Sequence, residues 1–134
     1  MTDERVERLR AIPLFSALSD EALARIADAA TEFEAQAGHV LVQPGQEGSG
    51  MFVLQEGTVV VERPGMSREQ GPGEFFGELA LLAPVVRSAR VRATTPVRCL
   101  AISRQAFAGV LEAEPAIALA ILRVLAQRLA EANA

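Results

Sequence analysis

Residues 75–89 combine the side chains needed to hold a phosphate and a sugar hydroxyl. They read Phe-Phe-Gly-Glu-Leu-Ala-Leu-Leu-Ala-Pro-Val-Val-Arg-Ser-Ala. Arg87 carries a planar cation that can bind a phosphate through two hydrogen bonds, whereas the Glu78 carboxylate only accepts hydrogen bonds and therefore suits a ribose hydroxyl. Gly77 lets the backbone approach a ligand closely. The run 78–82 is long enough for one short helix, whose free N–H groups would face an anion.

These residues lie inside a β-rich stretch from Phe33 to Ile102. Short apolar runs alternate there with turn signals rich in proline and glycine, which predicts an all-β core that fits a double-sheet jelly roll. The turn signals are Gln43-Pro44-Gly45, Gly48-Ser49-Gly50, Arg63-Pro64-Gly65 and Gly71-Pro72-Gly73. In residues 90–93, Arg-Val-Arg-Ala, the alternation turns the valine and alanine inward and leaves both arginines in solvent.

Helical patterns flank the β-rich stretch on both sides. Ser19 is a good N-cap, and acidic residues in the following turn favour an amphipathic helix before the barrel. After Ser103, helical spacing returns in one helix from Gln105 to Leu111. A second helix begins near Pro115, which suits a first helical turn, and runs toward the C-terminus.

The last helix is apolar around much of its circumference. Its principal stripe has coiled-coil spacing and consists of Ala118, Leu122, Leu125 and Leu129, broadened by Ile117, Ile121 and Val124. Core packing on the barrel is the first interpretation of this face. A homodimer seam along the same helix is the second.

Composition excludes several classes of function. The 134 residues fit one domain, 1–134, without room for an added catalytic domain. A net charge of −4 and scattered arginines argue against a nucleic-acid surface. The charged N-terminus is no signal peptide and no apolar run reaches membrane-spanning length, so a cytoplasmic protein without a membrane partner is expected. Abundant Ala and Arg without Lys are typical of a GC-rich bacterial genome.

The sequence contains one cysteine and one histidine, the residue types that could support redox, metal-binding or acid–base chemistry. Cys99 cannot form an internal disulfide and is expected to be a small buried hydrophobe. His39 has no second histidine with which to build a metal site, and no serine lies in a nucleophile-elbow pattern. The sequence therefore predicts neither a metal centre nor a catalytic triad, and no enzyme activity.

Three segments together resemble a cyclic nucleotide-binding domain, the module of bacterial catabolite activator-type regulators, kinase regulatory subunits and cyclic nucleotide-gated channels. Residues 76–80, Phe-Gly-Glu-Leu-Ala, with residues 87–89, Arg-Ser-Ala, resemble the family's phosphate-binding cassette. Residues 12–19 resemble its N-terminal segment, and the glycines between 45 and 57 resemble those of its barrel strands. A short glycine motif alone is weak, but a cassette in register with both flanking regions is a strong signal.

The resemblance implies a fold, a ligand and a set of residues. The fold is mostly β with flanking helices: a double-stranded β-helix, or jelly-roll, barrel with an N-terminal helix, a short phosphate-binding helix and two C-terminal helices. The ligand is a cyclic mononucleotide, expected to be cAMP rather than cGMP. The family's roles place the cyclic phosphate on Arg87, the ribose 2′-hydroxyl on Glu78, and the remaining phosphate contacts on the amides of Leu79 and Ala80. The predicted ligand-binding residues are Gly77, Glu78, Leu79, Ala80, Arg87, Ser88 and Ala89.

The chain departs from the family pattern at three places. A valine, Val86, precedes the cassette arginine where proline is common, with the nearest proline displaced to Pro84. The segment from Val61 to Gly73 is shorter than usual, which affects the region that often walls the base. The given sequence ends at Ala134, close to where the family's last helix commonly covers the base, and its 134 residues include no helix-turn-helix module after that helix.

Two hypotheses remain from these observations. The leading one is a regulatory module that binds a cyclic mononucleotide without catalysis and transmits binding through its C-terminal helix. The alternative is a degenerate domain of the same fold that serves dimerisation or docking without binding a nucleotide. A jelly-roll metal enzyme fails on the number of available ligands, because His39 stands alone.

Overall fold

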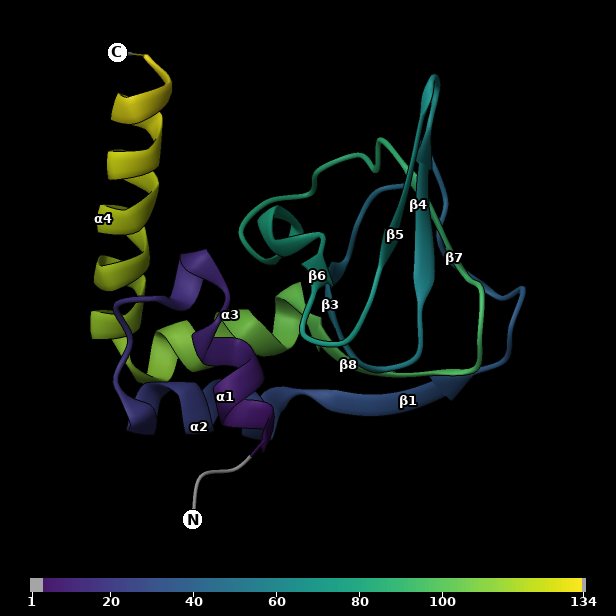
Figure 1. The fold of residues 1–134 in the computed structure, drawn as a ribbon. Helices are drawn as coiled ribbons and strands as arrows, with labels where there is room; N and C mark the ends of the chain where they lie inside the picture. Colours follow the sequence, from purple (N-terminus) through teal and green to yellow (C-terminus); the bar gives the residue numbers. More distant parts are fainter. Residues whose placement is uncertain (1–3, 134) are drawn as a thin grey trace.

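The computed structural model describes residues 4–133, and its strands form two facing antiparallel sheets (Figure 1). One sheet has the strand order β1-β8-β3-β6 and the other β2-β7-β4-β5. The strands are β1 (Thr31–Ala35), β2 (Val40–Val42), β3 (Gly50–Glu56), β4 (Val59–Arg63), β5 (Met66–Gln70), β6 (Phe75–Phe76), β7 (Arg90–Ala93) and β8 (Val97–Ser103). The predicted jelly-roll fold is confirmed, and its strands extend one or two residues beyond the expected stretch at each end.

Mainly small and β-branched side chains fill the space between the sheets. This inner core consists of Val42, Leu54, Val59, Val61, Ala89, Val91, Ala93, Val97 and Cys99, with Phe33, Phe52 and Phe76 packed against it. The alternation expected along β7 is present, since Val91 and Ala93 are buried and Arg90 is exposed. Arg92 is half-buried and pairs with Glu62 across the β4–β7 ladder at 3.4 Å. It is therefore less solvated than its place in the strand predicts.

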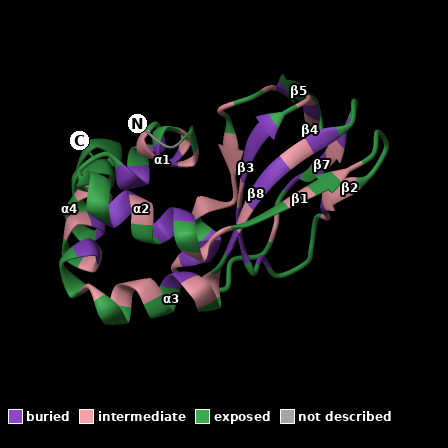
Figure 2. Ribbon diagram, turned by 90° about the horizontal axis from the view of Figure 1, so that it is seen from below, coloured by how far each residue is buried: buried purple, intermediate pink, exposed green. Residues whose placement is uncertain are grey.

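Helices cover the outer face of the β1-β8-β3-β6 sheet and bury a second core (Figure 2). They are α1 (Glu4–Arg10), η1 (Pro13–Phe15), α2 (Asp20–Ala29), η2 (Glu78–Leu81), α3 (Arg104–Ala113) and α4 (Pro115–Ala132). The predicted cap of α2 is present, because the Ser19 Oγ accepts a hydrogen bond from the Ala22 amide at 3.2 Å. Ser103 caps α3 in the same way, at 3.0 Å from the Ala106 amide. Helix α1 has no counterpart among the sequence predictions.

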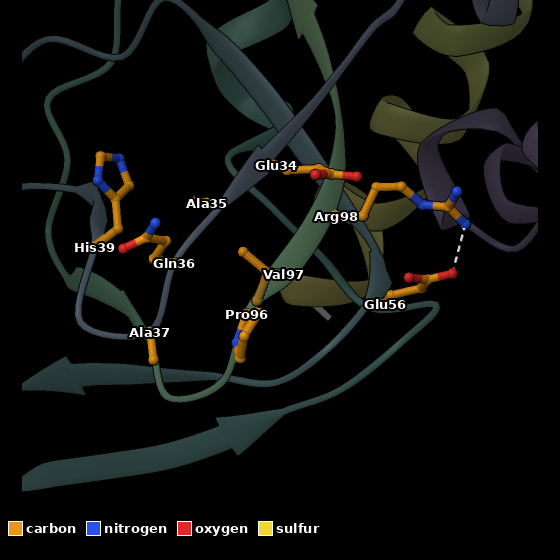
Figure 3. A pocket seen from close by; sticks show the side chains of 9 residues that line it. All are labelled: Glu34, Ala35, Gln36, Ala37, His39, Glu56, Pro96, Val97 and Arg98. Carbon is orange, nitrogen blue, oxygen red and sulfur yellow. Dashed lines mark hydrogen bonds and ion pairs between the residues drawn. The ribbon is translucent and has the colours of Figure 1, made fainter.

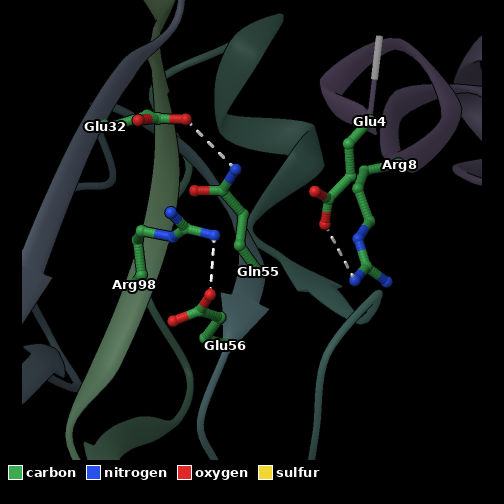
Figure 4. A network of polar contacts seen from close by, with 6 residues as sticks. All are labelled: Glu4, Arg8, Glu32, Gln55, Glu56 and Arg98. Atoms are coloured by element: carbon green, nitrogen blue, oxygen red, sulfur yellow. Dashed lines mark hydrogen bonds and ion pairs between the residues drawn. The ribbon is translucent and has the colours of Figure 1, made fainter. Parts of the chain in front are cut away.

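Polar side chains link the strands at one end of this outer face (Figure 4). Arg98 on β8 pairs with Glu56 on β3 at 2.7 Å, and the buried Gln55 donates a hydrogen bond to Glu32 on β1 at 3.2 Å. Because a buried amide without a partner is costly, these contacts help to fix the register of the three strands.

The C-terminal helix α4 packs on η1 and α3, and Figure 1 shows it beside the helices, away from the β4–β5 hairpin. Ile117 and Ile121 are buried and Leu125 is partly buried, so these residues form the packed face. Leu122 and Leu129 are 61% and 64% exposed. The predicted stripe is therefore divided, since Leu125 belongs to the packed face and the exposed leucines belong to another.

Within residues 4–133, no helix is both long and apolar enough to cross a membrane.

Candidate ligand-binding site

All seven residues selected from the sequence line one cavity of about 230 Å³. The cavity lies between η2, the segment 85–89 and the strands β2, β4 and β7. The predicted residues on its wall are Gly77, Glu78, Leu79, Ala80, Arg87, Ser88 and Ala89. The chain thus brings together two groups of residues that are separated by the loop around Pro84.

The turn between β6 and η2 depends on Gly77. Strand β6 pairs with β3 through Phe76, after which Gly77 takes a left-handed conformation with φ of +82°. An L-residue there would be strained, and its Cβ would overlap Nη1 of Arg87 and lie 3.1 Å from Cζ of the same side chain. Glycine therefore serves both the backbone turn and the close approach of the guanidinium.

The first turn of η2 contributes one free backbone donor at the predicted positions. The Ala80 amide already donates to the Gly77 carbonyl at 3.0 Å, whereas the Leu79 amide makes no hydrogen bond with another described residue. The two amides expected to meet a phosphate are therefore not equivalent. The Leu79 amide is available, and the Ala80 amide would have to give up or share an existing bond.

The backbone of Arg87 is fixed by pairing with the turn before β3. Its amide donates to the Gln46 carbonyl at 2.8 Å and its carbonyl accepts from Gly45 at 2.9 Å. The same pairing continues at Val86, which forms an isolated bridge with Glu47. The segment thus has an extended path without a proline directly before Arg87.

The guanidinium of Arg87 is partly buried and has no acidic partner among the described residues. Its Nη2 donates to the Gly50 carbonyl at 2.6 Å, and burial lowers the pKa of this arginine from its ordinary value. A cation that loses water without gaining a counter-charge is destabilised, so an anion in the cavity would relieve this cost.

Glu78 lines the same cavity as Arg87, yet the two side chains do not form an ion pair in the described structure. The Glu78 carboxylate also accepts no hydrogen bond from another described residue, and the exposed Ser88 hydroxyl makes none. The cavity therefore holds an unpaired acceptor, an unpaired cation and a free hydroxyl on its wall.

Several lining residues were not found from the sequence. Val61 and Arg63 extend the wall along β4, and the exposed Val85 and Val86 form an apolar rim next to Leu79. An adjoining hollow of about 590 Å³ shares Val61, Arg63, Phe76, Gly77 and Glu78 and continues under the β4–β5 hairpin. No local sequence signal marks Arg63, because its position depends on how the hairpin turns.

A larger open hollow of about 800 Å³ lies elsewhere, against β1 and β8 (Figure 3). Its charged and polar side chains include Glu34, Glu56, Arg98 and the exposed His39, and none of the predicted ligand residues. Arg98 is already paired with Glu56 at 2.7 Å. Among residues 4–133, no group of His, Cys, Asp and Glu side chains has the arrangement of a metal site.

Comparison with known proteins agrees with this geometry. The family model described as "Cyclic nucleotide-binding domain" matches residues 32–114. The chain belongs to this family. The match contains the whole cassette, from Gly77 to Ala89.

Relatives of this cyclic nucleotide-binding domain have different roles. A cyclic nucleotide-gated potassium channel of Rhizobium etli is 37% identical over 118 residues, covering 88% of this chain and 33% of the channel. A cAMP-dependent protein kinase regulatory subunit of Emericella nidulans is 36% identical, and the match covers 74% of this chain and 25% of the subunit. A cGMP-dependent protein kinase of Caenorhabditis elegans is 32% identical, and the match covers 74% of this chain and 14% of the kinase. The chain thus spans about a third or less of these relatives.

A solved structure matches the cyclic nucleotide-binding domain over nearly its full length. It is the N-terminal domain of a transcriptional regulator from Streptomyces coelicolor, with a TM-score of 0.84 and 35% identity, covering 94% of this chain and 92% of that one. Membership of the family and the jelly-roll fold therefore rest on both sequence and structure.

Proposed function

We propose that this domain is a non-catalytic regulatory module that binds a cyclic mononucleotide in the cavity between η2 and Arg87. The observation that carries the proposal is a pair of opposite charges on one cavity wall, Arg87 and Glu78, neither of which forms an ion pair with another described residue. Two such groups would normally pair with each other or with neighbours, because a partly buried charge that loses water without gaining a counter-charge is destabilised. A ligand that carries both an anion and a hydroxyl satisfies both.

Each end of the cyclic phosphate–ribose unit has a complementary group. Arg87 offers a planar, permanently charged donor to the phosphate, and the Leu79 amide and the Ser88 hydroxyl are free to add hydrogen bonds. Glu78 offers an acceptor to the ribose 2′-hydroxyl. The base would then extend toward the hollow under the β4–β5 hairpin.

We propose cAMP as the ligand, and one observation favours cGMP as the second candidate. Arg63 lines both the cavity and the adjoining hollow. An arginine is a donor only, and guanine presents two neighbouring acceptors, O6 and N7, where adenine presents one acceptor and one donor. If Arg63 reaches the base, Arg63→Ala should weaken cGMP more than cAMP in a calorimetric titration; equal losses would remove Arg63 from base selection.

Binding would be transmitted through the helices next to the cavity. Helix η2 contacts α3, and α3 contacts α4, so a displacement of η2 on binding would change how α4 is seated. We further propose that α4 forms a homodimer through its exposed leucines, of which Leu122 and Leu129 are the most exposed.

Calorimetry with cAMP and cGMP tests the proposal against the degenerate-domain alternative. A ligand that binds only the folded protein stabilises it by about 2.7 kcal/mol at a hundredfold excess over Kd, so the thermal midpoint should rise. The nucleotide should be recovered unchanged after prolonged incubation. No heat and no change in the midpoint at millimolar concentrations of both nucleotides would favour the degenerate domain, and accumulation of a linear mononucleotide would contradict a purely binding role.

A further inference from the structure

One arginine outside the cavity holds together the backbone segments on which the ligand site is built. Arg104 is the first residue of α3, and its amide donates to the Ser49 carbonyl at 2.6 Å. Its Nη1 lies 2.8 Å from the carbonyl of Gly48, 3.1 Å from that of Ala80 and 3.2 Å from that of Ala83. A single nitrogen with two hydrogens therefore meets three acceptors, one from the turn before β3 and two from η2 and the residues just after it.

One of the three carbonyls belongs to a residue that lines the cavity, and the other two lie close to lining residues. Ala80 is in η2 and lines the cavity, and Ala83 lies two residues after the end of η2. Gly48 lies against Arg87, because a Cβ added to this glycine would be 2.6 Å from Arg87 Cζ and 3.0 Å from Ala80 Cβ. Arg104 thus fixes η2 and the seat of Arg87 relative to each other, and does so from the first residue of α3.

The carbonyl contacts matter more than the acidic contact of this side chain. Arg104 Nη2 lies 3.5 Å from the Glu47 carboxylate, whose side chain is 62% exposed, so this pair is long and screened by water. Carbonyls at the end of a short helix lack partners in the helix itself, and a cation there satisfies them. Arg104 supplies that cation from a different element.

We propose that Arg104 is a positioning residue: it holds η2 in the arrangement that receives the cyclic nucleotide and couples that turn to α3. The coupling to a ligand rests on the proposed function, whereas the positioning of η2 is a property of the protein without ligand. Arginine suits this role because its planar guanidinium holds Nη1 toward the carbonyls while Nη2 faces Glu47, whereas a lysine ammonium lies on a flexible stem.

Amide exchange followed by NMR tests the positioning without ligand. The Leu82 and Ala83 amides both donate to the Leu79 carbonyl, at 3.1 and 3.2 Å, and therefore report on η2. Arg104→Ala should speed exchange of both amides several-fold, and Arg104→Lys should give an intermediate rate and remains informative if the alanine variant is unstable. Unchanged exchange at both amides in both variants would overturn the positioning role.

Titration with cAMP and cGMP tests the coupling. Arg104→Ala should weaken binding about tenfold although Arg104 does not line the cavity, and nucleotide-induced changes in the amide signals of α3 should shrink. Unchanged affinity together with unchanged α3 signals would contradict the coupling. If the wild-type protein binds neither nucleotide, the proposed function fails, and the ligand-free exchange still decides the positioning.

Three control variants separate the positioning role from general effects. Ser103→Ala removes the cap of α3, which weakens the helix start without touching η2, and Arg98→Ala removes a cation of similar exposure, 34% against 30% for Arg104, outside the cavity. Both should leave η2 exchange and affinity within about twofold of wild type, as should Glu47→Gln. An effect of Ser103→Ala equal to that of Arg104→Ala would show that α3 stability, and not the Arg104 tether, sets the site.

Discussion

Gly77→Ala should weaken ligand binding while leaving the domain folded. With φ of +82°, any L-residue at this position adopts a left-handed conformation, which costs about 1–2 kcal/mol of stability. The added methyl group would also overlap Arg87 Nη1 and lie 3.1 Å from the Gly50 carbonyl, which accepts the hydrogen bond from Arg87. Because the guanidinium is the flexible end of a side chain, it would move away from its seat while the barrel stays folded.

The binding penalty follows from the loss of that seat. Removing one partner of a buried charged contact costs about 2–5 kcal/mol, and a displaced arginine would lose part of this, so cAMP affinity should fall by about tenfold to several hundredfold. Urea unfolding gives the stability and calorimetry gives the affinity.

Gly38→Ala is a matched control for this substitution. Gly38 has φ of +92° and no atom within 4 Å of an added Cβ, so it shares the backbone strain without the overlap. It should lose similar stability and keep wild-type affinity. Equal affinities for the Gly77 and Gly38 variants would refute the argument that the glycine makes room for Arg87.

Three further predictions concern other parts of the molecule. Wild type should prefer cAMP over its 2′-deoxy analogue, and Glu78→Ala should abolish that preference; additive penalties in this protein–ligand cycle would place Glu78 outside the ribose contact. Leu122→Glu with Leu129→Glu should convert a dimer to a monomer in light scattering, whereas a monomeric wild type at high concentration would exclude the α4 dimer. Burial raises the pKa of the Cys99 thiol to about 11, so the folded protein holds this proton above the ordinary thiol range. The resulting stability, at most about 3 kcal/mol, is fully present below about pH 9 and is lost as the pH rises through the folded pKa. In urea unfolding, Cys99→Ala should lack this decline. The same pH dependence of stability in wild type and Cys99→Ala would contradict the raised thiol pKa.

Local sequence patterns were sufficient to predict structural features where one residue type has one dominant physical role. Ser19 before an acidic turn predicted the cap of α2, and the oxygen is bonded to the Ala22 amide. The isolated Cys99 predicted a buried thiol, and its side chain is fully buried. The cassette predicted a ligand site because glycine, a carboxylate and a guanidinium at this spacing are informative together. All seven residues line one cavity, and their contacts with a ligand stay a prediction.

Features that depend on tertiary contacts could not be predicted in the same way. Helical spacing predicted an apolar stripe along α4. Which of its leucines are covered depends on where η1 and α3 pack against the helix, and these contacts leave Leu125 partly buried and Leu122 exposed. Arg104 follows a serine cap like many arginines at a helix start, and its role requires three carbonyls that are distant in sequence to converge on it. Arg92 looked solvated because its partner, Glu62, lies on another strand.

The most direct test of the proposed phosphate site is the affinity of Arg87→Ala for cAMP and cGMP, measured by calorimetry beside wild type. Arg87 has no acidic partner of its own among the described residues, so its removal breaks one carbonyl contact in the free protein and should leave the fold intact. The ligand phosphate would then keep only neutral donors, at a cost of about 2–5 kcal/mol. We expect a loss of about thirtyfold to several thousandfold for whichever nucleotide wild type binds. Binding to folded Arg87→Ala with wild-type affinity would contradict the assignment of this cavity as the phosphate site.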